Sequence, residues 1–373
     1  GRKRQRRSAD FATLVNAVPS ALRARNYATI VREKFLLRQL IGATHRVMES
    51  AYEDRMPAQE TLDYAEKEVL AVTERRVTGE AVKLQDLIHD VFHSIESREE
   101  GVLTGEPTGF LLLNEYTCGL QPGELIIVAG RPSMGKTAFG LNLAEHLAIA
   151  EHPRRPVLFF SLEMSRLQVA QRILCSRARV NSHRLRQART TNADLERLKR
   201  TANELSDAPL LVDDSTDLTI LEMRARARMA ARKYKIRAVF VDYLQLMRLP
   251  GSENRQQEVA SISRGLKALA KDLSVPVVAM AQLNRNTEDK ARHGNRPRMS
   301  DLRESGAIEQ DADVIMLLHR EAYYKTGQTV GEDDEAPAAP PQAMIDQEGE
   351  EAELIIAKQR NGPVGVVKML WNK

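Results

Sequence analysis

The sequence has little of what marks secreted or membrane-spanning proteins. Its 373 residues include only two cysteines, Cys118 and Cys175, which are too few for a disulfide framework or a zinc site. No apolar run approaches the roughly 18 residues that a membrane-spanning helix needs, and no signal-peptide pattern opens the chain. These absences predict a cytoplasmic protein in a reducing environment, without a membrane partner.

A strong charge of one sign is also missing, because 55 Lys and Arg residues face 51 Asp and Glu residues. Basic residues gather at the start, where residues 1–7 contain five of them, and acidic residues gather within 331–350. We interpret 331–350 as a disordered acidic loop and 1–7 as a solvated tail, with contact to nucleic acid as the alternative for the tail. The chain begins with Gly1 rather than Met, which is compatible with a fragment of a longer protein.

The N-terminal part of the chain has helical periodicity. Val31, Phe35 and Leu40 recur at helical spacing, and a second apolar stripe follows between residues 62 and 72. The segment 82–95 is shorter and amphipathic, with an apolar face that needs a partner. Packing on its own domain and docking on a neighbouring subunit both satisfy that need.

From about residue 120, short apolar runs alternate with longer helical stretches. The runs lie at 124–129, 157–161, 238–242, 275–281 and 313–318, and two more strand-like runs follow at 353–358 and 364–370. Runs that are apolar on both faces belong to a parallel sheet with helices on both sides. The pattern therefore predicts a doubly wound α/β domain.

The segment Gly130–Thr137 reads GRPSMGKT, which matches the phosphate-loop pattern G-x-x-x-x-G-K-[ST] between a predicted strand and a predicted helix. Glycines let backbone N–H groups face phosphate oxygens, and the helix N-terminus adds positive potential. We expect Lys136 to reach the β- and γ-phosphates and the Thr137 hydroxyl to bind Mg²⁺. The predicted nucleotide-contacting residues of the loop are Gly130, Ser133, Gly135, Lys136, Thr137 and Ala138.

Two acidic residues at predicted strand ends extend this site. Asp242 ends the run 238–242, the position that supports Mg²⁺ in phosphate-loop enzymes. Tyr243 follows it, so no glutamate beside Asp242 can activate water. Glu163, just after the run 157–161, is the favoured base, and interaction with a helix dipole is its alternative role. Arg172 either pairs with Glu163 or the phosphates, or is a surface arginine.

Near the C-terminus, residues 358–362 read KQRNG. Lys358 and Arg360 point the same way on an extended segment, because strand side chains alternate. Their cations suit a polyphosphate in a neighbour's site, since Lys136 already serves the chain's own site. A basic surface hairpin fits the spacing equally well, so the spacing leaves the choice open. Gln359, between the two cations, is a further candidate for nucleotide contact.

In combination these motifs resemble the bacterial replicative helicase family DnaB, in its RecA-like motor domain. The resemblance covers residues from about 101 to 370. It is carried by GLQPGELIIVAGRPSMGKTAF at 119–139, SLEMS at 161–165, VDYLQLM at 241–247, SDLRESGAIEQDADVIM at 300–316 and KQRNGPVG at 358–365. Related recombinases share the phosphate loop but not LRESGAIEQDAD. Residues 9–95 resemble the family's helical hairpin and linker helix, through AVPSALRARNYATIVREK at 17–34.

The resemblance implies a RecA-like α/β P-loop NTPase with a mostly parallel central sheet, preceded by a partial all-α N-terminal domain and a linker helix. The expected domains are a helical hairpin at 1–78, a linker at 79–104 and the motor at 105–373. The implied activity is ATP-driven 5′ to 3′ translocation on single-stranded DNA and duplex unwinding by a homo-hexameric ring. Mg²⁺ and ATP, or another nucleoside triphosphate, are the implied cofactors. Primase and a helicase loader are the implied partners, in a bacterial or phage replisome.

The resemblance also implies residue roles. Lys136 and Thr137 bind phosphate and Mg²⁺, Glu163 is the catalytic base, and Gln282 senses the γ-phosphate. It favours Lys358 and Arg360 as fingers that act in a neighbour's site. Arg303, Glu304 and Gly306 match the family loop that holds the phosphodiester backbone of single-stranded DNA, which suits a grip on phosphates without base reading.

Two departures from the family pattern concern partners. The N-terminal collar that carries part of the primase contact is incomplete, and the chain ends at Lys373 without the family's aromatic-containing tail. A RecA/RadA-type DNA-dependent ATPase that forms filaments is one alternative, which the helical hairpin and separate linker helix disfavour. A truncated ring subunit that does not unwind is another, which the full set of nucleotide-site residues disfavours.

Overall fold

The computed structural model describes residues 24–53, 57, 61, 64–65, 68–69, 83–96, 102–248, 254–284, 296–321 and 349–372. The chain divides into two compact units, residues 1–99 and residues 100–373. The finer division at residues 78 and 104 stays a prediction. The basic segment 1–7 and most of the acidic segment 331–350 lie outside the described residues.

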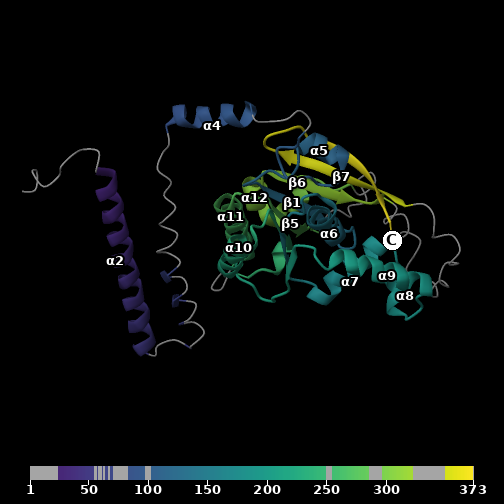
Figure 1. Cartoon of the computed structure of the whole chain (residues 1–373), viewed down its shortest axis with the longest axis horizontal. Coiled ribbons are helices and arrows are strands. Elements are labelled where there is room, and N and C mark those ends of the chain that lie inside the picture. The colour runs from purple at the N-terminus through teal and green to yellow at the C-terminus, as the bar shows by residue number, and fades with distance from the viewer. Residues whose placement is uncertain are drawn as a thin grey trace, which may run out of the picture. The chain divides into compact units, whose positions relative to one another are not determined.

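Two helices make up most of what is described in the first unit, α2 (Ala24–Glu53) and α4 (Leu84–Glu96) (Figure 1). Helix α2 is tied to the following segment by an ion pair of 2.6 Å between Arg46 and Glu68. Helix α4 confirms the helix predicted at 82–95. Its apolar residues are exposed, with Leu84 at 71% and Phe92 at 60%. The expected need of this helix for a partner is therefore not met within the described residues.

The second unit is built on one eight-stranded sheet, in the order β3-β2-β4-β5-β1-β6-β7-β8. Strands β1 to β6 run parallel, and β7 and β8 add an antiparallel hairpin beside β6. The strands are β1 (Leu125–Gly130), β2 (Val157–Ser161), β3 (Leu210–Asp213), β4 (Ala238–Asp242), β5 (Val277–Gln282), β6 (Val314–His319), β7 (Glu350–Gln359) and β8 (Gly365–Trp371). The predicted mostly parallel sheet is confirmed.

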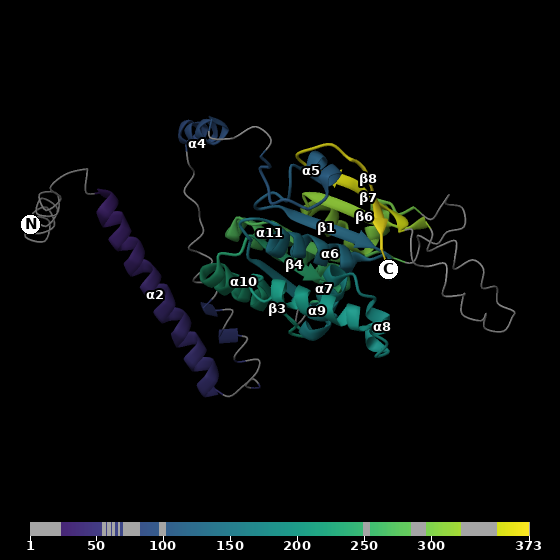
Figure 2. The ribbon, with the colours of Figure 1, turned by 45° about the vertical axis from the view of Figure 1, so that its right-hand side comes forward.

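Helices cover both faces of this sheet, because its central strands are buried on both sides. One face packs against α10 (Ile220–Tyr234), α11 (Arg255–Leu273) and α12 (Gly306–Asp311). The other packs against α5 (Leu111–Thr117), α6 (Lys136–Glu145), the π-helix His146–Ala150 and α7 (Arg166–Ala178). Figure 2 shows the two layers on either side of the strands. The remaining elements are α8 (Ser182–Arg186), α9 (Asn192–Leu205) and the 3-10 helices Leu244–Leu246 and Met299–Ser305.

Strand β3 was not predicted from the sequence. It is four residues long and only partly buried, because it lies at the edge of the sheet beside β2. Its pairing with β2 carries residues 213–215 to the edge where β2 and β4 also end. In open parallel sheets this carboxyl edge is where ligands bind, and it is where the predicted site lies.

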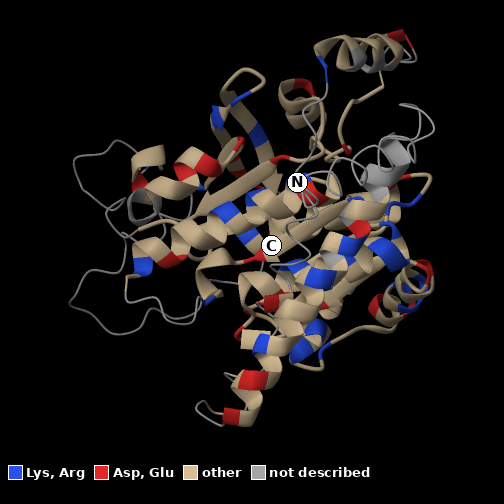
Figure 3. Cartoon of the chain, turned by 90° about the vertical axis from the view of Figure 1, so that its left-hand side faces the viewer, with Lys and Arg blue, Asp and Glu red and all other residues tan. Residues whose placement is uncertain are grey.

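Surface charge is mixed along the helices. Basic and acidic segments share the same helices in Figure 3, as expected from nearly equal numbers of the two kinds. Within the described residues, no helix is both long and apolar enough to cross a membrane.

Candidate nucleotide-hydrolysis site

The phosphate loop joins β1 to α6, as predicted. Ser133 and Gly135 adopt left-handed backbone conformations, with φ of 64° and 100°. Gly135 is also closely approached, since a Cβ atom there would lie 2.2 Å from the Trp371 ring. A glycine is therefore required at Gly135 both for its φ and for space. The turn directs the start of α6 toward the carboxyl edge, where a helix N-terminus favours an anion.

Lys136 is folded back onto its own loop. Its Nζ atom donates hydrogen bonds of 3.0 Å to the carbonyl oxygens of Gly130 and Arg131. Burial lowers the pKa of Lys136, while the carboxylates of Asp242 and Glu163 act in the opposite direction. The structure thus brings the predicted lysine and both predicted acids into one electrostatic group.

Asp242 ends β4 and is 1% exposed. Neither of its carboxylate oxygens has a hydrogen-bond partner of ordinary geometry among the described residues. Burial raises the pKa of Asp242, while the nearby Thr137 hydroxyl and the cations Lys136 and Arg172 lower it. A buried carboxylate without partners is costly unless a cation or its water shell completes it. Asp242 and Thr137 therefore fit a Mg²⁺ ion held partly through water.

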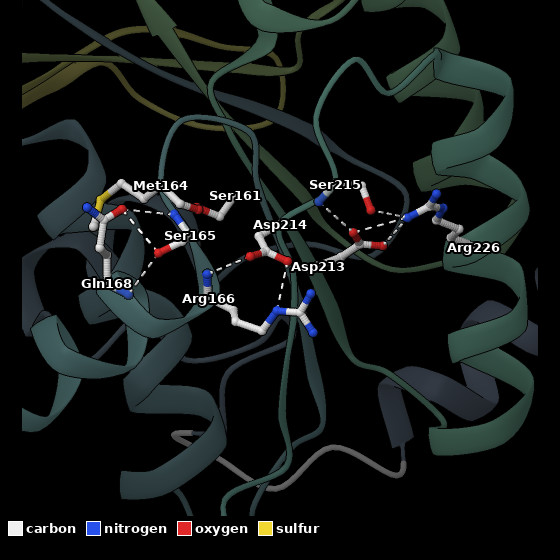
Figure 4. Close-up of polar contacts among 9 residues, drawn as sticks. All are labelled: Ser161, Met164, Ser165, Arg166, Gln168, Asp213, Asp214, Ser215 and Arg226. Carbon is white, nitrogen blue, oxygen red and sulfur yellow. Dashed lines mark hydrogen bonds and ion pairs between the residues drawn. The ribbon is translucent and has the colours of Figure 1, made fainter.

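Glu163 lies on the turn between β2 and α7, and its side chain is exposed. Strand β2 pairs with β4 in register, with Ser161 opposite Asp242, and the Leu162 N–H donates to the Asp242 carbonyl at 2.8 Å. Figure 4 shows the turn and the hydrogen bonds around it. Arg172 is exposed on α7, and within the described part of the chain it forms no ion pair with Glu163, although its charge lowers the pKa of Asp242.

Gln282 ends β5 at the same edge, with an exposed side chain. The side chain of Gln245 binds both backbone groups of Gln282. The Gln245 amide donates to the Gln282 carbonyl at 3.1 Å, and its oxygen accepts from the Gln282 N–H at 3.1 Å. Gln245 lies in the motif VDYLQLM, but its role was not predicted, because a clamp on backbone atoms leaves no pattern in the sequence.

Lys358 and Arg360 lie elsewhere, at the other end of the sheet. The Lys358 Nζ atom donates to the carbonyl oxygens of Glu309 and Ala312, and Arg360 donates to that of Gln310. The backbone N–H of Arg360 binds the Asp313 carbonyl at 3.0 Å.

Gln359 points away from these two cations, as strand alternation requires. Its side chain donates to the Tyr116 carbonyl at 3.0 Å, on α5. The structure thus does not bring Lys358, Gln359 or Arg360 together with the chain's own phosphate loop.

The predicted DNA loop falls on the 3-10 helix Met299–Ser305 and the start of α12. The side chains of Arg303 and Glu304 lie outside the described residues. Gly306 is exposed, and a Cβ atom there would meet nothing within 4 Å. The backbone at Gly306 is therefore accessible from outside.

Two residues beside the phosphate loop were missed in the sequence. Arg320 directly follows β6, and its guanidinium lies 4.5 Å from the ring centroid of Trp371 while donating to the Ser133 carbonyl at 3.3 Å. Glu350 completes the group by an ion pair with Arg320. Trp371 is the single tryptophan of the chain, which is the one sequence feature that could have pointed to this group. Its contact was not predicted, because it is far in sequence from residues 130–137.

Comparisons with known proteins agree with this geometry. Residues 105–373 match the family described as "DnaB-like helicase C terminal domain". The chain is 42% identical over 380 residues to the replicative DNA helicase DnaB of Haemophilus influenzae, covering 97% of this chain and 75% of the relative. It is 40% identical over 368 residues to that of Geobacillus stearothermophilus, covering 97% of this chain and 76% of the relative.

Solved structures give the same result. One is a DnaB-like replicative helicase studied with its interactions with primase. It matches at a TM-score of 0.72 and 29% identity, over 97% of this chain and 80% of that one. Another solved structure, of an ATPase domain, matches at a TM-score of 0.68 and 32% identity, over 78% of this chain and 96% of that one.

Proposed function

Because this chain belongs to the DnaB-like helicase family and is a replicative DNA helicase, we propose that it hydrolyses ATP in sites shared between neighbouring subunits of a hexameric ring. Its ATP-dependent activity makes it an enzyme that uses a nucleotide and a divalent metal ion, and we propose Mg²⁺ as that ion. The ring moves 5′ to 3′ on single-stranded DNA in a bacterial or phage replisome in the cytoplasm.

The positions of the two cationic groups carry the shared-site proposal. The phosphate loop follows Gly130, at the carboxyl end of β1. At the amino end of β1, the Leu125 N–H binds the carboxylate of Asp313, whose carbonyl binds the Arg360 N–H. Six strand residues span roughly 16 Å. Lys358 and Arg360 are therefore at the wrong end of the sheet to serve their own phosphate loop.

A finger on one end and a phosphate loop on the other define two different surfaces of the same subunit. Contacts between unlike surfaces are head-to-tail, and they close into a ring when the rotation allows it. The exposed apolar face of α4 fits this arrangement as the segment that docks on a neighbouring motor. We propose that Arg360 and Lys358 stabilise the transferring phosphoryl group of the neighbour's nucleotide.

Within the subunit that binds the nucleotide, each residue has a distinct task. Backbone N–H groups of the loop and Lys136 bind the phosphates, and Thr137 with Asp242 holds the metal ion. That ion supplies charge neutralisation at the phosphate oxygens. Glu163 orients and deprotonates the attacking water, and Gln282 contacts the γ-phosphate from the end of β5.

DNA is held by the loop that contains Arg303, Glu304 and Gly306. An accessible backbone at Gly306 suits phosphate binding without base reading. Arg172 and Gln359 remain candidates for nucleotide contact, and for Gln359 this requires release from Tyr116. Primase and a helicase loader are the proposed protein partners.

Subunit mixing tests the shared site. Lys136→Ala and Arg360→Ala are each expected to abolish ATP hydrolysis alone. In rings reassembled from both, roughly a quarter of the interfaces join an intact loop to an intact finger, so hydrolysis should return. As the control, Lys136→Ala is mixed with the double variant Lys136→Ala/Arg360→Ala, and no activity should return. If Arg360→Ala is inactive alone and neither mixture recovers, Arg360 acts in its own subunit's site, whereas an active Arg360→Ala protein would place Arg360 outside catalysis.

Two further measurements test DNA unwinding and the hexameric ring. The first is strand displacement on a forked DNA substrate, and the second is particle mass with an ATP analogue and single-stranded DNA. We expect six-subunit particles and unwinding that Glu163→Gln abolishes. Hydrolysis and DNA binding without unwinding, on filaments, would favour a RecA-type activity instead.

A further inference from the structure

The turn that carries Glu163 is exposed and needs support from its neighbours. Inside the turn, the Ser161 hydroxyl donates to the Met164 carbonyl at 2.7 Å. Ser165 then caps α7, with its N–H bound by the Gln168 side chain at 3.0 Å. These contacts are local and fix the shape of the turn, and the bond from the Leu162 N–H to the Asp242 carbonyl ties its β2 side to β4.

Asp214 makes a contact that reaches the α7 side of the turn from outside. It directly follows β3, the strand at the sheet edge beside β2. One of its carboxylate oxygens accepts the Arg166 backbone N–H at 2.9 Å, and the other lies 3.0 Å from the Arg166 Nε atom. Figure 4 shows both contacts between the end of β3 and the start of α7. The backbone contact is independent of the side chain at position 166.

The chain segment that carries Asp214 is held in place through the neighbouring Asp213. The preceding residue, Asp213, accepts hydrogen bonds of 2.9 and 3.1 Å from one guanidinium nitrogen of Arg226 on α10. Its carboxylate also accepts the Ser215 N–H at 3.0 Å. The segment 213–215 is thus fixed to α10 on one side and to the start of α7 on the other.

We propose that Asp214 is a positioning residue for hydrolysis, which sets the location of Glu163 by holding the first residue of α7. The proposal rests on the proposed role of Glu163 as the base. The contacts of Asp214 are with Arg166, and it is not one of the residues proposed to bind the nucleotide or the attacking water. Losing its contact lets the turn and Glu163 shift together, and small displacements of a catalytic group cost much rate. Lys136 and Thr137, which are proposed to bind phosphate and the metal ion, lie on α6 and are held by the phosphate loop rather than by Asp214.

The test compares DNA-stimulated ATP hydrolysis by Asp214→Ala, Asp214→Asn and Arg166→Ala variants of the whole 373-residue chain. We expect Asp214→Ala to lower kcat by about tenfold or more with KM for ATP unchanged. Asp214→Asn keeps an acceptor for the Arg166 N–H and should recover most of the rate. Arg166→Ala keeps the backbone contact and should be nearly normal. Asp272→Ala is the matched control, because Asp272 also binds arginines, Arg224 at 2.9 Å and Arg228 at 3.1 Å, away from the site.

Combination with Glu163→Gln separates the outcomes. If Asp214 acts through Glu163, adding Asp214→Ala to Glu163→Gln lowers the residual rate no further. An equal loss in both backgrounds, an unchanged kcat in Asp214→Ala, or a loss that Asp272→Ala reproduces would overturn the proposal. A Glu163→Gln protein with the wild-type rate would instead overturn the role of Glu163. Thermal unfolding of each variant separates a folding defect from a rate effect.

Discussion

The two ends of β1 differ in how their charged groups are satisfied. At the carboxyl end, the buried Asp242 carboxylate has no hydrogen bond of ordinary geometry among the described residues, although the Thr137 hydroxyl is nearby, and Lys136 binds carbonyls of its own loop. At the amino end, the buried carboxylate of Asp313 binds the Leu125 N–H and the Lys267 ammonium. Lys358 there binds two backbone carbonyls. We call the carboxyl end incomplete and the amino end complete with respect to these two carboxylates: among the described residues Asp242 accepts no hydrogen bond of ordinary geometry, whereas Asp313 accepts two.

In the proposed shared site, this difference means that the two ends of β1 would become active in different ways. An incomplete end gains from binding a ligand, because a nucleotide and a metal ion remove a desolvation cost that the fold already carries. A complete end must exchange its contacts before it can act on a neighbour. In the proposed shared site, Lys358 and Arg360 would therefore have to leave carbonyls at the end of α12, a helix that directly follows the proposed DNA loop.

The largest expected effect is on the rate of ATP hydrolysis, with the stability of the fold unchanged. Arg360→Ala should lower kcat for ATP by about a thousandfold, since a finger in trans contributes factors of this size. The free energy of unfolding of the isolated chain should change by less than about 0.5 kcal/mol, as for other surface changes. Arg360 is 46% exposed, and its ion pair with Asp313 is long, at 3.6 Å. Steady-state hydrolysis and urea unfolding measure the two quantities.

Lys368→Ala is the control on the same hairpin, since its exposed ion pair with Glu351 is 3.0 Å long. It should keep the full rate. A kcat for Arg360→Ala within a few-fold of the wild-type value would show that Arg360 does not act in catalysis at a neighbour's site.

The second effect concerns stability at the complete end. Asp313→Ala removes the partner of Lys267 and of the Leu125 N–H, and both partners of the Asp313–Lys267 pair are largely buried, at 7% and 18% exposure. Breaking one side of such a pair costs about 3 kcal/mol. Urea unfolding should show this loss, whereas Glu351→Ala, in an exposed pair, should change little. Equal effects of the two variants would mean that the amino end is not the more strongly paired one.

The third effect has the opposite sign, at the incomplete end. Asp242→Asn replaces a buried charge, for which desolvation outweighs the nearby Thr137 and cations, by a neutral group, so the nucleotide-free protein should gain about 1 kcal/mol in stability. ATP hydrolysis should be lost at the same time. Asp272→Asn, which weakens satisfied ion pairs with Arg224 and Arg228, should instead lose stability. A nucleotide-free Asp242→Asn protein less stable than the wild type would contradict the claim that this end is incomplete.

The incomplete end was the more predictable from sequence. Its residues occur in a contiguous motif at Gly130–Thr137 or at the ends of strongly apolar strands, as for Glu163 and Asp242. Parallel strands place their carboxyl ends together, so the residues could be grouped without coordinates. The mostly parallel sheet followed from the same apolar runs, while the short edge strand β3 gave no comparable signal.

The complete end was less predictable because its contacts use backbone atoms. The spacing of Lys358 and Arg360 showed that they share a face, but nothing in the sequence indicates that the carbonyls of residues 309, 310 and 312 receive them. The same holds for the Gln245 clamp on Gln282. Contact between Arg320 and Trp371 depends on the sheet order, which joins segments distant in the chain.

The smallest effect extends the comparison to pH. His319 is buried near the carboxyl end of β6, and burial is the main cause that lowers its pKa below the ordinary value of 6.5. Arg296 lowers it further, while Glu353 and Glu321 act in the opposite direction. The imidazole therefore binds a proton at a higher pH in the unfolded chain than in the folded one. As a result, the free energy of unfolding decreases as the pH is lowered through 6.5. His319→Gln should remove that part of the loss between about pH 7 and pH 5. The change should be smaller than the gain from Asp242→Asn, and urea unfolding at both pH values measures it. An unchanged pH dependence of stability in His319→Gln would show that the buried histidine does not contribute to the loss of stability at low pH.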